Sequence, residues 1–257
     1  MITIEVVSEY LGMDADKEMW KYGHRHWLAL FPNLGSRSSF VRQAANLWEY
    51  KSLIQQRLAQ QLLGAFVDHV HLIDGIPIAL CGFSRAPRCR LFTTEASYGY
   101  CAAKKLTYYG FHGHLLMSAT GIITGFTLTP ANGSEREALW EVVSNVQGVV
   151  IGDKGYLSQF LGEQLQAHNL SLQTPLRANM HDERQRSQVK LLQRVRRLIE
   201  TVMGQLVDRF HIEKVRARDL WHLTSRLNRK LLAHTLCRWL NRHHPDPLQF
   251  DDLVTED

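Results

Sequence analysis

Three carboxylates of this sequence stand where a charge needs a partner. Asp74 in HVHLIDGIPIAL and Asp153 in GVVIGDKGYLS each end a short apolar run, whereas Glu200 lies inside the helix-like segment VRRLIETVMGQL. A charge bordering a buried strand is costly to desolvate unless an opposite charge meets it. Three carboxylates around one pocket raise one another's pKa values, and two hard cations with oxygen ligands relieve that repulsion. The residues therefore predict a site for two Mg²⁺ ions, with Mn²⁺ as a substitute, suited to in-line phosphoryl transfer on nucleic acid.

Each of the three acids also has a purely structural interpretation. Asp74 is followed by glycine and could form a turn at a strand end, and Asp153 could do the same while pairing with Lys154. Glu200 has Arg197 close by, a spacing typical of a surface ion pair. The catalytic hypothesis therefore depends on a fold that brings the three acids to one place.

The elements that would position these acids change character along the chain. Residues 8–66 have the three- and four-residue apolar spacing of helices, and the pattern then changes abruptly to β-rich runs. Ser134 precedes Glu137 by three, which predicts a capping box at the start of a helix. The elements we expect after residue 66 are strands at 69–80, 104–118 and 121–130, a helix at 134–146, a strand at 148–153, a helix at 157–169, a strand at 171–176 and a helix at 188–210.

This order of elements predicts an α/β fold with a ribonuclease-H-like mixed five-stranded sheet flanked by helices, preceded by a small helical N-terminal region. A Rossmann fold is the main alternative, but no GxGxxG follows the first strand. In the ribonuclease-H-like order the first and fourth strands are neighbours. Asp74 and Asp153 can then converge, and Glu200 on the last helix can approach them.

The positive charge of the chain is unevenly distributed. The net charge is +5, and residues 177–244 hold sixteen Lys and Arg against six Asp and Glu. Such an excess suits a polyanionic partner, although a solvated helical surface is the alternative.

No apolar run approaches the ~20 residues that span a bilayer, and the start of the sequence lacks a signal-peptide pattern, so we expect a cytoplasmic protein without membrane contact. The domains we expect are a helical region at 1–66, a domain at 67–242 that holds the three acids and an acidic tail at 243–257.

Several longer blocks of the sequence resemble a known family. They are IDGIPIALC, SYGYCAAKKLTYYGFHGHLLMSATGIITGFTLTPANGSEREAL, GDKGYLS, TPLRANM and IETVMGQLVDRFHIEKVRARDLWHLTSRLNRKLLAHTLC. In this order they are similar to the DDE transposases of bacterial insertion sequences, closest to the insertion sequence nine-eighty-two group. The resemblance implies that Asp74, Asp153 and Glu200 form a catalytic triad that binds two divalent metal ions.

The resemblance also implies the partners. They are the terminal inverted repeats of the element and the target DNA, held by a homodimer on paired ends at the bacterial nucleoid. The residues we expect to contact DNA are Lys104, Lys105, Lys154, Tyr156, Arg177, Arg196 and Arg197. His112 and His114 share one strand face and could bind a metal, although no third ligand is evident. Of the aromatic residues near Lys105, we expect Tyr109 and Phe111 to be core residues.

The sequence departs from the family at two points. Its helical N-terminal segment is shorter than the resemblance implies, so we expect part of the DNA-binding or assembly region to be absent. Gly75 stands where the resemblance would place serine. Two other functions remain open: a metal-dependent nuclease of the same fold that stops at hydrolysis, and an inactive DNA-binding remnant of a transposase.

Overall fold

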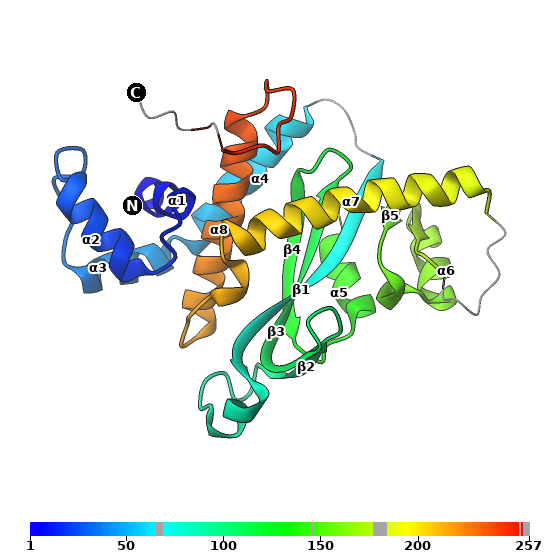
Figure 1. Cartoon of the computed structure of the whole chain (residues 1–257), viewed down its shortest axis with the longest axis horizontal. Coiled ribbons are helices and arrows are strands. Elements are labelled where there is room, and N and C mark those ends of the chain that lie inside the picture. Colours follow the sequence, from blue (N-terminus) through cyan, green and yellow to red (C-terminus); the bar gives the residue numbers. More distant parts are fainter. Residues whose placement is uncertain (65–68, 145, 177–183, 252, 254–257) are drawn as a thin grey trace. The chain divides into compact units, whose positions relative to one another are not determined.

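The apolar runs in the middle of the chain form one mixed sheet in the computed structural model (Figure 1). The structure describes all residues except 65–68, 145, 177–183, 252 and 254–257. Within the described residues the sheet has six strands, in the order β2-β3-β1-β5-β6, with β4 also paired to β3. The strands are β1 (Val70–Gly82), β2 (Ser97–Cys101), β3 (Leu106–Ser118), β4 (Ile123–Pro130), β5 (Gly148–Ile151) and β6 (Leu170–Gln173).

Strands β2 and β4 occupy successive stretches of the same edge of β3. Residues 106–110 of β3 pair with β2, and residues 111–117 pair with β4, all antiparallel. Strand β1 pairs antiparallel with β3 on its other side, and β5 and β6 continue the sheet in parallel. Ignoring β2, the order is that of a ribonuclease-H-like sheet, which confirms the predicted fold class. Strand β2, an insertion between β1 and β3, was not predicted.

The pairing of β1 changes at the point where the predicted site begins. Among the described residues, β5 pairs with β1 only from Val70 to Leu72, while β3 pairs with β1 as far as Gly82. One edge of β1 therefore lacks a paired strand beyond Leu72. Pro77, which has no N–H to donate, is compatible with such an edge. Asp74 lies at the start of this one-sided stretch.

Three helices flank the sheet: α5 (Glu135–Val142), α6 (Gln159–Ala167) and α7 (Arg186–Asp208). Ser158 caps α6 by accepting a hydrogen bond from the N–H of Leu161 at 3.3 Å. The capping box expected at Ser134 is wrong, because its side chain accepts no cap hydrogen bond from any described residue, although α5 does begin directly after it. Two short 3₁₀ turns, η1 (Phe83–Arg88) and η2 (Lys154–Tyr156), follow β1 and β5.

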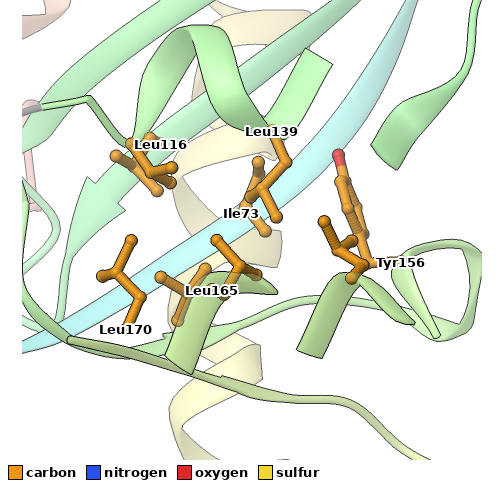
Figure 2. Packing of buried hydrophobic residues seen from close by; sticks show 9 residues of the cluster. Ile73, Leu116, Leu139, Tyr156, Leu165 and Leu170 are labelled. Carbon is orange, nitrogen blue, oxygen red and sulfur yellow. The ribbon is translucent and has the colours of Figure 1, made fainter. Parts of the chain in front are cut away.

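The core beside these helices is an apolar cluster that includes one buried tyrosine. Ile73 and Leu116 from the sheet meet Leu139 of α5 and Leu165 of α6, all of them buried (Figure 2). Tyr156 of η2 completes the cluster. This packing fixes η2, and with it the residues that follow β5, against the sheet.

The chain divides into two compact units, Leu63–Met203 and Met1–Leu62 with Gly204–Asp257. The sheet belongs to the first of these, which we call the sheet unit, and the other is the helical unit. The domain boundary expected at residue 66 falls among residues that the structure does not describe, and the boundaries at 66 and 242 stay predictions. The elements of the helical unit are α1 (Ile2–Tyr10), α2 (Asp16–His26), α3 (Arg37–Asn46), α4 (Trp48–Leu63, which ends at the boundary), η3 (Ile212–Lys214) and α8 (Leu220–Leu240).

Buried ion pairs hold α8 against α1 in the helical unit. The Nε of Arg229 donates to Glu9 at 2.6 Å, and Lys230 donates to the other oxygen of the same carboxylate at 2.8 Å. Lys51 pairs in the same way with Glu5 at 2.8 Å. Arg229 and Lys230 belong to the positive excess at 177–244 that was expected to suit a polyanionic partner. For these two residues that expectation is wrong, because both are 1% exposed.

No helix in the described part of the chain combines the length and the apolar character needed to cross a membrane.

Candidate active site

The register of β1 and β5 brings Asp74 and Asp153 together. The last parallel pair is Leu72 with Ile151, and each aspartate follows two residues later on its own strand. A β-carbon on Gly152 would lie 3.2 Å from Ile73, so the two chains stay side by side past the last paired residues. Neighbouring strands lie about 4.8 Å apart, and residues two positions further on point to the same face. The two carboxylates therefore leave adjacent strands on the same side.

Asp74 is a half-buried carboxylate in a negatively charged setting. Its pKa is raised to about 6, mainly by burial and also by the charges of Asp153 and Glu200, against the lowering effects of the Gly75 hydrogen bond and of Arg196. The N–H of Gly75 donates to its Oδ1 at 2.8 Å. Glu200 of α7 is the weakest of these influences on the pKa of Asp74.

Asp153 anchors the turn that follows β5. Its Oδ1 accepts a hydrogen bond of 2.7 Å from the N–H of Gly155, which makes it the N-cap of η2. A β-carbon on Gly155 would overlap the carboxylate of Glu135, so the glycine leaves room for that side chain against the turn. Burial, followed by the charges of Asp153 and Asp74, raises the pKa of Glu135 to about 7. Glu135, at the first position of α5, is thus a fourth carboxylate of this site.

Glu200 reaches the site from an exposed position on α7. Ile199 and Val202, on either side of it in sequence, are buried, whereas Glu200 and Arg197 are exposed and Arg196 is half-buried. The guanidinium of Arg196 lies one helical turn before Glu200 and lowers the pKa of Asp74. The helix therefore carries Glu200 and Arg196, whose charges act on Asp74, and the exposed Arg197 lies beside them in the sequence.

His112 and His114 stack beside the carboxylates without forming a metal pair. Their ring centroids are 4.7 Å apart. His114 is buried, with its Nδ1 3.2 Å from the Tyr156 hydroxyl and its Nε2 3.0 Å from that of Thr129, so both ring nitrogens are already occupied. Burial lowers the pKa of His114 to about 4, so the ring is neutral at pH 7. His112 fills the space beside Gly75, where a β-carbon would overlap its ring.

The expected DNA contacts lie in different surroundings. Lys154 and Arg197 are exposed next to the acids, as the predicted role requires. Tyr156 does not fit it, because its ring is 0% exposed and its hydroxyl is bonded to His114. Arg177 lies outside the described residues.

Lys104 and Lys105 are exposed but do not lie with the acids. They occupy the turn between β2 and β3, at the end of the sheet where Gly82 pairs with Tyr108. Eight residues of β1 separate Gly82 from Asp74, roughly 25 Å along the strand at about 3.3 Å per residue.

The donor chemistry of the site fits hard divalent cations, while its geometry is open. Asp74, Glu135, Asp153 and Glu200 supply oxygen ligands. The pKa values of Asp74 and Glu135 are raised first by burial and then by neighbouring carboxylates, and a bound cation would offset both effects. Within the described residues, however, no three Asp, Glu, His or Cys side chains lie close enough together to hold an ion. Glu135 was not predicted as a site residue, because its position in the sequence indicated only the start of a helix.

Comparison with known proteins agrees with this geometry. A family model described as the transposase DDE domain matches residues 64–220, which is more than half of the chain and includes all four carboxylates. No curated protein and no solved structure gives a significant match. The match agrees with the ribonuclease-H-like strand order and with the adjacent strands that carry Asp74 and Asp153. The chain belongs to the transposase DDE domain family.

Proposed function

We propose that this protein is the DNA transposase of a bacterial insertion sequence of the nine-eighty-two group, which cuts DNA at the ends of its element and joins them to target DNA. One observation carries the proposal. In a chain of the transposase DDE domain family, Asp74 and Asp153 leave adjacent strands side by side, and Glu200 acts electrostatically on Asp74 from α7.

The three carboxylates would hold two Mg²⁺ ions, which Mn²⁺ could replace. Bound there, divalent cations supply Lewis-acid stabilisation of the negative charge that develops on a phosphate under attack. The protein's own contribution is to fix the acids. The Gly75 N–H holds Asp74, the Gly155 N–H holds Asp153, and the buried residues Ile199 and Val202 seat the helix that carries Glu200.

The cations near the acids would hold the DNA backbone. Lys154, Arg196 and Arg197 flank the carboxylates and suit phosphates on either side of the cut. Lys104 and Lys105 would contact the backbone further along the DNA, and Arg177 stays an expected contact. Tyr156 has no part in DNA contact because its ring is buried.

The proposed reaction has two steps at one site. Water first attacks the phosphate at the element end and releases a 3′-hydroxyl, and that hydroxyl then attacks a phosphate of the target DNA. Each step breaks one P–O bond and forms another, so the acids perform the same task twice. Two ends must be joined, which favours a homodimer on paired ends, working in the cytoplasm at the nucleoid.

A joining assay tests the proposal. Labelled oligonucleotides that carry the inverted repeats flanking the gene are incubated with supercoiled plasmid and Mg²⁺ or Mn²⁺, and the expected products are nicked donor strands and donor–plasmid joints. Efficient cutting without joints would point to a nuclease and contradict transposition. DNA binding without metal-dependent cutting would indicate an inactive remnant and contradict both catalytic steps.

A further inference from the structure

The insertion between β1 and β3 forms an extension of the sheet with its own surface. We call residues 82–106 the β2 arm; it contains η1, β2 and the turn that leads into β3 (Figure 1). Strand β2 pairs with residues 106–110 of β3, whereas β4 begins its pairing at Phe111. The arm is therefore built on the part of β3 that β4 does not reach.

One face of β2 is packed and the other is open. A β-carbon on Gly99 would lie 2.7 Å from the Ala131 side chain and 2.8 Å from its carbonyl oxygen, so this face fits closely against the residues after β4. Side chains alternate along a strand, so Tyr98 and Tyr100 point to the opposite face. They are 45% and 64% exposed.

A third aromatic ring joins this open face. Phe83 of η1 is 62% exposed, and its ring lies 5.8 Å from that of Tyr98, edge to face. The neighbouring aromatic residues Tyr108, Tyr109 and Phe111 are buried and fill the interior. Tyr98 touches this interior through Tyr109, with ring centroids 5.4 Å apart, yet Phe83, Tyr98 and Tyr100 are each at least 45% exposed. Exposed aromatic surface of this kind marks an interaction site more often than a stable free surface.

The charge of the arm is strongly positive. Residues 82–106 contain five Lys and Arg and a single acid, Glu95. All five bases are exposed: Arg85, Arg88, Arg90, Lys104 and Lys105. Aromatic faces among cations are the combination that binds single-stranded nucleic acid, because bases stack on the rings while phosphates meet the charges. Duplex DNA offers the phosphates alone, since its base faces are covered by stacking.

We propose that the β2 arm binds unpaired DNA, with bases stacked on Phe83, Tyr98 and Tyr100 and phosphates held by the surrounding Arg and Lys residues. The inference rests on the proposed function, in which strand separation at the cut end supplies the single strand. The arm begins about 25 Å along β1 from Asp74, a distance that several unpaired nucleotides can span.

The test measures binding without cutting. Fluorescence anisotropy with labelled dT20 and with a 20-base-pair duplex is recorded for the full-length protein in EDTA. Because each ring can stack a base, Tyr98→Ala/Tyr100→Ala should weaken dT20 binding at least about tenfold and duplex binding less than about twofold. Tyr98→Phe/Tyr100→Phe, which keeps the rings, should bind dT20 within about twofold of wild type. Phe160→Ala is the matched control, because Phe160 is 68% exposed on α6 and lies outside the arm, and it should leave both affinities unchanged.

Two results would overturn the inference. One is wild-type dT20 binding by a folded double-alanine variant, and the other is an equal loss on dT20 and duplex, which would assign the arm to duplex DNA. A loss in the phenylalanine variant as large as in the alanine variant would also contradict stacking. These outcomes are independent of the proposed function: an arm that binds dT20 in a protein that never cuts DNA would refute only the transposase proposal, whereas cutting by a protein whose arm variants bind normally would refute only this inference.

Discussion

Replacing Asp74 by asparagine should stabilise the protein at neutral pH in the absence of divalent ions. The pKa of Asp74 rises from 3.8 to about 6 on folding, mainly through burial. A shift of two pKa units corresponds to roughly 3 kcal/mol of penalty on the ionised form. Asparagine carries no charge and keeps an oxygen that can accept the Gly75 N–H, so the variant should be more stable than wild type by about 2–3 kcal/mol at pH 7.5.

The pH dependence of this gain has a defined sign. Between pH 3.8 and about 6 the folded protein holds the Asp74 proton more tightly than the unfolded chain does, so wild-type stability falls as the pH rises through this window. The asparagine variant lacks this loss. At pH 4 the difference between the two proteins should therefore shrink to less than about 1 kcal/mol.

Calorimetric unfolding in EDTA at pH 7.5 and pH 4 measures both quantities. The expected gain at pH 7.5 raises Tm by about 5–10 °C for a protein of this size. Glu163→Gln is the control, because Glu163 is an exposed carboxylate on α6, and it should change stability by less than about 0.5 kcal/mol. A variant less stable than wild type at pH 7.5, or equally stabilised at both pH values, would refute the reasoning.

Further predictions follow from the same contacts. Saturating Mg²⁺ or Mn²⁺ should raise the wild-type Tm, by the equivalent of about 2.7 kcal/mol at a hundred times Kd, and should raise that of Asp153→Asn less; equal shifts in calorimetry would exclude Asp153 as a ligand. Gly75→Ser should destabilise the fold by about 1–3 kcal/mol, because its side chain would overlap the His112 ring. His112→Ala in the same chain should recover part of that loss in urea unfolding, and no recovery would show that the overlap is not the cause. Arg229→Ala should cost about 3–5 kcal/mol in urea unfolding, because it leaves the Glu9 carboxylate without one of its two buried cations; a loss under 1 kcal/mol would contradict that pairing.

Local patterns in the sequence predicted the sheet well, because they record burial along each strand. The runs around Asp74 and Asp153 are apolar since both strands are central, and the strand order then required the two acids to be neighbours. The five-residue strand β2 left no such signal, since SYGYC combines a glycine with two exposed tyrosines.

Contacts between residues far apart in the chain were beyond the reach of local patterns. DKGY is typical of an exposed turn, yet Tyr156 is buried in the apolar cluster, and its hydroxyl shares a hydrogen bond with His114, 42 positions earlier. Glu135 belongs to the site only because Gly155 leaves it room. On α8, Arg229 is paired with Glu9, which lies 220 positions earlier in the chain.

The measurement that tests the central claim most directly is the rate of Mg²⁺-dependent nicking at the element ends by wild type and by three single variants. Asp74→Asn, Asp153→Asn and Glu200→Gln should each lose about a thousandfold, because several kcal/mol of charge stabilisation disappear with each ligand, at about 1.4 kcal/mol for every tenfold. Glu163→Gln should cut at the wild-type rate. Wild-type nicking by any of the three variants would contradict the assignment of that carboxylate to the active site.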